Sequence, residues 1–271
     1  MKWAYLVLLI AVLFFSASCI GDARSSEQAL KDQVKLILTI VYDNNGYDQR
    51  LETMWGFSCM IEGLAKTILF DTGGDGVTLL GNMRKLDIDP AEVDVVVLSH
   101  IHADHVGGLN SLLEENSDVI VYLPESFPQS FKDGVKSLGA RVYEVSGPEE
   151  LFAGVYTTGE LGNGIREQSL VIATGEGLVL ITGCAHPGVV DIIQTAKGLV
   201  PKEEVYLTMG GFHLSGAATP EIESVIQGFR RLGVRKVAPC HCSGDETRRL
   251  FKEEYREDYI NSGAGKKIAI P

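Results

Sequence analysis

Four potential metal ligands fall within the stretch Ser99-His100-Ile101-His102-Ala103-Asp104-His105, which follows the apolar run Val93 to Leu98. These side chains cannot all point one way from a helix or a strand, so the pattern predicts an irregular turn that wraps around a ligand. Imidazole together with carboxylate suits a divalent metal ion. A polar loop of capping and solvated residues is the alternative, but the spacing favours the metal site.

The chain has six histidines, and the three outside this cluster share one kind of position. His186, His213 and His241 each follow an apolar run and stand in a glycine-flanked turn. Because ligand sites in α/β folds gather where strands end, these turns can converge on one pocket. A structural hydrogen bond at a turn is the alternative role for each of the three.

Strand and helix patterns alternate along the chain, which predicts an α/β fold in a single domain over residues 33–271. Residues 67–73 and 179–186 each run from an apolar strand into a polar ligand type beside glycine, and this similarity suggests two related halves. In the first of these stretches the strand ends at Asp71, whose carboxylate is placed to reach into a site. An ordinary turn-forming aspartate is the alternative for Asp71.

Residues 1–19 have the pattern of an export signal, with Lys2 followed by a short apolar run and then small residues. Cys19 suggests a lipoprotein signal cleaved before a lipidated cysteine, although Ser16 stands where leucine is usual. An uncleaved anchor is a third interpretation. All three predict a protein in the periplasm, at the cell surface or anchored to the membrane through its N-terminus.

Net charge limits the partners that this chain can bind. A formal charge of -12 repels phosphate backbones and anionic lipid, so we expect no nucleic-acid partner and membrane contact only through the N-terminus. The expected partner is a small-molecule substrate, and the sequence does not predict an oligomeric state. It assigns no disulfide either, because three pairings are open to the cysteines Cys59, Cys184, Cys240 and Cys242.

The motif His-x-His-x-Asp-His after a buried strand, with Asp-Thr-Gly upstream and later histidines at strand ends, resembles the metallo-β-lactamase superfamily. The resemblance covers essentially the whole mature chain. It implies a four-layer αββα sandwich of two similar halves with a metal site at one edge. The turns 183–188, 210–214 and 239–244 further resemble the branch that includes archaeal dihydropterin-methyl-ribofuranosylaminobenzene-phosphate synthases.

Carried over residue by residue, this resemblance implies two metal ions. The implied ligands are His100, His102 and His186 for one ion, and Asp104, His105 and His241 for the other. Asp71 would support these ligands from behind, holding their orientation and charge. Many hydrolases of the superfamily have an aspartate shared by both ions, and the matching stretch of this chain has His213 instead.

These features lead us to expect an exported metal-dependent hydrolase acting on a small ester, lactone, amide or phosphoester. A bound metal ion would make hydroxide available near neutral pH, with His213 and Asp71 as the catalytic residues and His213 as the proton carrier. Zinc is the expected metal, with manganese and iron left open. Two alternatives remain: a pterin-type transferase like the branch named above, and a non-catalytic metal-binding lipoprotein.

Overall fold

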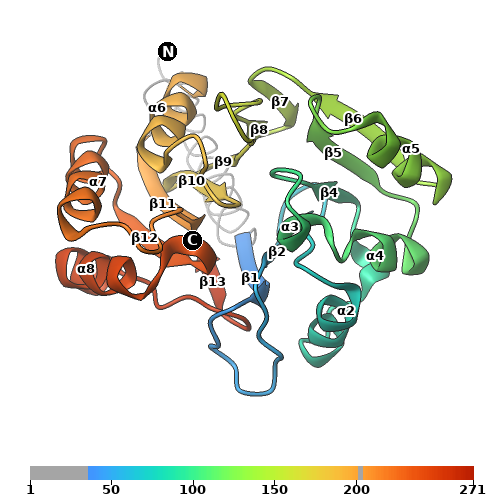
Figure 1. Cartoon of the computed structure of the whole chain (residues 1–271), viewed down its shortest axis with the longest axis horizontal. Coiled ribbons are helices and arrows are strands. Elements are labelled where there is room, and N and C mark those ends of the chain that lie inside the picture. Colours follow the sequence, from blue (N-terminus) through green and yellow to red (C-terminus); the bar gives the residue numbers. More distant parts are fainter. Residues whose placement is uncertain (1–35, 201–203) are drawn as a thin grey trace, which may run out of the picture.

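The computed structural model describes residues 36–200 and 204–271, which form two β-sheets packed face to face with helices on both outer sides (Figure 1). The expected signal segment, residues 1–19, lies outside the described residues. Within the described ranges, every helix is too short or too polar to cross a lipid bilayer.

The first sheet has seven strands in the spatial order β13-β1-β2-β3-β4-β5-β6. The strands from β13 to β3 are antiparallel neighbours, and those from β3 to β6 run parallel. Their bounds are β1 (Leu36–Asp43), β2 (Phe57–Glu62), β3 (Ile68–Phe70), β4 (Val95–Val97), β5 (Ile120–Pro124), β6 (Arg141–Val145) and β13 (Lys267–Ile270).

The second sheet has six strands in the order β12-β11-β10-β9-β8-β7. Here β10, β11 and β12 are parallel, and the remaining pairs are antiparallel. The bounds are β7 (Glu149–Phe152), β8 (Val155–Thr157), β9 (Leu170–Thr174), β10 (Gly177–Thr182), β11 (Val205–Gly211) and β12 (Lys236–Cys240). The sequence did not predict β7, a short edge strand that alternates poorly between apolar and polar residues.

Helices cover the outer face of each sheet (Figure 1). The first sheet carries α2 (Gly76–Lys85), α3 (Ala103–Val106), α4 (Leu109–Glu115) and α5 (Gln129–Ser137). The second carries α6 (Val189–Leu199), α7 (Thr219–Arg231) and α8 (Asp245–Tyr255). The described residues also include three single turns of 3-10 helix: η1 (Pro90–Glu92), η2 (His241–Ser243) and η3 (Arg256–Asp258).

Three clusters of buried apolar side chains lie between these layers. The central cluster joins the two sheets, with Val97 of β4 and Ile181 of β10 among its members. A second packs helices such as α2, through Met83, against the first sheet, and a third packs α7, through Phe229, against the second. Burial of apolar area is the dominant favourable term in folding, so these clusters hold the layers together. The expected four-layer αββα sandwich is confirmed.

The parallel strands place the polar residues of interest at one edge of the sandwich. Asp71 follows β3 and His100 comes soon after β4, which are parallel neighbours in the first sheet. In the second sheet His186, His213 and His241 follow β10, β11 and β12, which are also parallel. Because the carboxyl ends of parallel strands share an edge, all five residues are brought to the same side of the molecule.

Candidate metal centre

The histidine cluster begins in the loop after β4 and ends in α3. His102 is the N-cap residue of α3, and Asp104 and His105 lie within its single turn. The expectation of an irregular turn is therefore wrong for the second part of the cluster. The helical turn brings Asp104 Oδ2 to 3.7 Å from His105 Nε2, and in the preceding loop His100 Nε2 lies 3.1 Å from His102 Nδ1.

Asp71 holds this cluster from behind. Its buried Oδ1 accepts the Ser99 backbone N–H at 2.7 Å, and its Oδ2 accepts Ser99 Oγ–H and His105 Nδ1–H, each also at 2.7 Å. Burial raises the pKa of Asp71 to about 7, because desolvation outweighs the nearby His100 and these hydrogen bonds. The contacts fix the ring of His105 and the start of the loop.

Glu167 performs the matching task in the second half, and the sequence did not predict it. Its buried Oε1 accepts the backbone N–H groups of Cys184 and Ala185 at 2.9 and 2.8 Å. Its Oε2 accepts both the backbone N–H and Nδ1–H of His186, at 2.9 and 2.8 Å. Burial alone would raise the pKa of Glu167, but these hydrogen bonds, led by that from His186, lower it to about 2.

His241, in η2 after β12, is oriented by Asn44. The Asn44 amide donates to the His241 carbonyl oxygen at 3.3 Å, which leaves Asn44 Oδ1 to accept from His241 Nδ1 at 3.0 Å. His241 Nε2 is then buried, has no hydrogen-bond partner among the described residues, and lies 3.3 Å from Asp104 Oδ2. Two acceptor atoms this close need positive charge between them, from a proton or a metal ion. Burial opposes a proton, but Asp104 outweighs it and raises the pKa of His241.

The same tautomer recurs around the site. Nδ1 of His100 contacts Ser99 Oγ at 2.9 Å, while those of His105 and His186 donate to the carboxylates described above. An imidazole that donates through Nδ1 presents the lone pair of Nε2, as metal-binding histidines do. Burial also lowers the pKa of His100 and of His105 to about 3, which keeps both rings neutral. This donor set fits a divalent metal ion.

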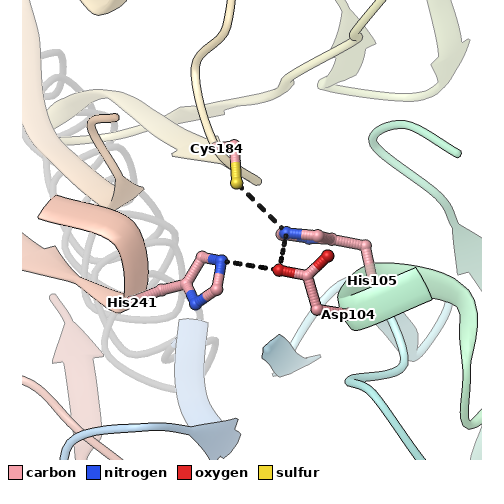
Figure 2. A group of neighbouring side chains, drawn as sticks. All are labelled: Asp104, His105, Cys184 and His241. Carbon is pink, nitrogen blue, oxygen red and sulfur yellow. Dashed lines mark hydrogen bonds and ion pairs between the residues drawn. The ribbon is translucent and has the colours of Figure 1, made fainter. Parts of the chain in front are cut away.

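In the part of the chain that the structure describes, the donor atoms gather into three groups, and within each group all the atoms lie within 4.8 Å of one another. The groups are Asp104, His105, Cys184 and His241; His100, Cys184 and His186; and Cys184, His213 and Cys242. Figure 2 shows the first group, with Cys184 Sγ 3.2 Å from His105 Nε2. His102 is in none of them, but its ring centroid lies 4.9 Å from that of His186. The structure thus brings the six expected ligands together and adds a thiol to which the sequence assigned no role.

His213 lies beside the donor groups of the expected ligands. Its exposed ring is centred 4.4 Å from that of His186. A hydrogen bond from the ring to the Cys242 sulfur raises the pKa of His213. A hydrogen bond from Cys184 in turn lowers the pKa of Cys242 to about 5 and raises the pKa of Cys184. A catalytic role for His213 stays a prediction.

Strained backbone conformations collect at this site. Among the described residues six that are not glycine have a left-handed φ, and four of these are Asp71 at 56°, Ala185 at 65°, His213 at 52° and His241 at 47°. Such conformations cost free energy and persist where the surrounding structure holds them, commonly at functional sites. The positive φ values therefore support a functional site at the ends of β3, β10, β11 and β12.

An open pocket of about 590 Å³ adjoins the donor groups. Asp104 lines this pocket and also belongs to the first donor group. Trp55 lines this pocket and is 55% exposed, and its ring is centred 4.9 Å from that of His241. Exposed apolar side chains beside polar donors are typical of small-molecule sites. The lining residues are Tyr42, Met54, Trp55, Gly74, Asp75, Val77, Thr78, Ala103 and Asp104.

Comparison with known proteins agrees with this architecture. Residues 56–200 match the family model of the metallo-β-lactamase superfamily. The chain belongs to this superfamily. A curated relative from Methanocaldococcus jannaschii, 7,8-dihydropterin-6-methyl-4-(β-D-ribofuranosyl)-aminobenzene-5'-phosphate synthase, is 32% identical over 88% of this chain and 97% of its own. The uncharacterized protein MJ0448 of the same organism is 27% identical over 86% of this chain and 100% of its own.

A solved structure is similar along nearly the same length. Tm1679, described as a metal-dependent hydrolase of the β-lactamase superfamily, matches with a TM-score of 0.73 at 28% sequence identity. The match covers 87% of this chain and 99% of Tm1679. Together with the donor groups, membership of the superfamily supports an enzyme that depends on divalent metal.

The expectation that this enzyme is a hydrolase is wrong, whereas its export stays a prediction. The curated relative matched along 97% of its length is a synthase. Tm1679 is described by reaction class alone. The physical reason for the error is that a metal-ligand pattern does not specify whether water or another nucleophile attacks the substrate, which the pocket decides.

Proposed function

We propose that this protein is a metal-dependent synthase that joins a dihydropterin to the amine of an aminobenzene ribofuranosyl phosphate. The observation that carries the proposal is the 32% identity with the synthase of that name along 97% of its length. The pocket supports it, because planar aromatic substrates need exposed apolar surface, and this pocket has Trp55, Met54 and Val77.

The proposed reaction is a substitution at the methylene carbon attached to the pterin ring. A C–N bond forms between this carbon and the aromatic amine, the C–O bond to a diphosphate leaving group breaks, and the amine loses a proton. Divalent metal, when bound, supplies positive charge that stabilises the departing diphosphate. The residues that would hold it are His100, His102, Asp104, His105, His186 and His241.

The chain's own residues would orient the two substrates. Asp75 lies in the pocket and accepts hydrogen bonds from Tyr42 Oη and the Thr78 backbone N–H at 2.9 and 2.8 Å. Each carboxylate oxygen keeps a lone pair for the amino groups of a pterin ring. His213 is exposed beside His186, and we assign it the role of accepting the amine proton.

The test uses full-length protein loaded with zinc and mixed with hydroxymethyl-dihydropterin diphosphate and aminobenzene ribofuranosyl phosphate. We expect equal amounts of coupled product and diphosphate by mass spectrometry, and loss of both after chelation. His102→Ala should abolish coupling, whereas Glu114→Ala, on the exposed side of α4, should not. Diphosphate release without coupled product, or no turnover by protein that holds metal, would overturn the proposal.

A further inference from the structure

We propose that Cys184 binds metal as a thiolate ligand shared by the two donor groups that the expected ligands form. The first group is Asp104, His105 and His241, and the second is His100 and His186. The inference rests on the metal centre of the proposed function, and neither the sequence pattern nor the relatives assign this residue a role.

The position of Cys184 is the first argument. It is the one residue that belongs to both groups, with its Sγ within 4.8 Å of every donor atom in each. Its Sγ lies 3.2 Å from His105 Nε2, whose lone pair faces it because Nδ1 donates to Asp71. With metal–nitrogen bonds of about 2.0 Å and metal–sulfur bonds of about 2.3 Å, tetrahedral ligands sit about 3.5 Å apart. The observed separation therefore suits two ligands of one ion.

The buried carboxylates nearby are already committed to other partners. Asp71 and Glu167 accept the hydrogen bonds described above. Asp43 accepts from the backbone and side-chain N–H groups of Asn45 and from the backbone N–H of His241. Among the described residues, then, none of these three can bridge the groups without breaking contacts that hold the ligands, and His213 belongs to neither group.

Thiolate chemistry supplies what the shared position needs. Sulfur has several lone pairs and can bind two cations, whereas an imidazole nitrogen has one lone pair. Glu167 holds the Cys184 backbone N–H at 2.9 Å, and the side chain is buried, so the sulfur is positioned before metal arrives. Soft sulfur ligands favour zinc or iron over magnesium, manganese or calcium. A Cys184 ligand therefore also limits the expected metal to zinc or iron.

A competing arrangement uses the same thiol differently. Cys184, His213 and Cys242 form the third donor group, and Cys242 Sγ lies 3.5 Å from the Cys184 carbonyl oxygen. A metal ion bound there would involve both cysteines. Cys242 belongs to this group alone, so it provides the matched control variant.

Cobalt(II) substitution of the full-length protein separates these arrangements. Visible d–d bands report cobalt in the site, and a near-ultraviolet band reports charge transfer from thiolate to cobalt. We expect both in the wild type, loss of the charge-transfer band alone in Cys184→Ser, and retention of both in Cys242→Ser. The inference is overturned if the charge-transfer band survives in Cys184→Ser, disappears in Cys242→Ser, or is absent from wild type that shows d–d bands.

A second measurement needs no variant. A small alkylating reagent, followed by peptide mass spectrometry, should modify Cys184 more slowly in zinc-loaded wild type than after chelation, while Cys59, remote in the central core, serves as internal reference. Equal rates for Cys184 would contradict the inference. Failure to bind cobalt or zinc would overturn the proposed function as well, whereas metal binding without a thiolate ligand overturns this inference alone.

Discussion

The two halves of the site are built differently, although one buried carboxylate organises each. In the first half the expected ligands come from one short stretch, His100 to His105, which Asp71 supports through His105. In the second half the expected ligands come from separate turns. Glu167 accepts three backbone N–H groups and a ring N–H, and its pKa falls to about 2. Asp71 accepts one backbone N–H, and its pKa rises to about 7. The hydrogen bonds that Glu167 accepts, led by that from the His186 side chain, therefore keep its charge in the absence of metal, whereas those to Asp71 do not outweigh its burial.

Glu167→Ala should show this difference most strongly. It leaves three backbone N–H groups and His186 Nδ1–H buried without acceptors. At about 1–3 kcal/mol for each unsatisfied group, we expect the free energy of unfolding to fall by on the order of 4 kcal/mol. Denaturant titration of metal-free protein measures this, with Glu114→Ala expected within about 0.5 kcal/mol of wild type. A loss below about 1 kcal/mol would mean that Glu167 does not hold the turn.

His213→Ala distinguishes ligands from other histidines of the second half. Because His213 lies outside the donor groups of the expected ligands, we expect metal content to stay at the wild-type level. Loss of a proton carrier should lower kcat about a hundredfold. Elemental analysis and steady-state kinetics measure the two effects, with His102→Ala as the contrasting variant that loses metal. Metal loss in His213→Ala would show that the ring is a ligand.

Neutral isosteres compare the two carboxylates directly in metal-free protein. Glu167→Gln should lower the free energy of unfolding at pH 7 by about 2 kcal/mol, since it removes a charged acceptor, and Asp71→Asn should lower it by less than about 1 kcal/mol. The lowered pKa of Glu167 means that its charge stabilises the fold above its ordinary pKa of 4.5, and this stability is lost as pH falls toward about 2.

The raised pKa of Asp71 gives its contribution to stability the opposite pH dependence. Its contribution is fully present below its ordinary pKa of 3.8 and is lost as pH rises through about 7. The wild-type advantage over Glu167→Gln should therefore shrink as pH falls toward about 2, while that over Asp71→Asn should grow. If the free-energy differences from wild type change with pH in the same way for both variants, the assigned difference between Glu167 and Asp71 is contradicted.

Trp55→Ala tests the pocket, all of whose lining residues come from the first half. Loss of ring stacking is worth about 0.5–1.5 kcal/mol, so KM for the pterin substrate should rise up to about tenfold with little change in kcat. Tyr143→Ala provides the control, because Tyr143 is an exposed aromatic residue on β6 outside the pocket. If both substitutions raise KM equally, the pocket does not bind the pterin substrate.

The same contrast between the halves explains which features were predictable. Residues 100–105 are close in sequence, and a glycine-flanked turn after an apolar strand marks His186 and His241, so local patterns indicate these candidate ligands. The four-layer sandwich and the division of the ligands between two ions followed from the family resemblance. Glu167 precedes β9 with no motif around it, and its function depends on a turn that comes later in the chain. Cys184 stands two residues before His186, but its contact with His105 arises only when the two sheets pack.

The most direct test of a site assembled from both halves is a crystal structure of the zinc-loaded protein with anomalous scattering at the zinc edge. We predict two anomalous peaks, which mark two zinc ions. One ion should be bound by His100, His102 and His186, and the other by Asp104, His105 and His241. Cys184 Sγ should lie about 2.3 Å from both. Peaks bonded to ligands of one half only, or a single peak at Cys242 and His213, would contradict the account.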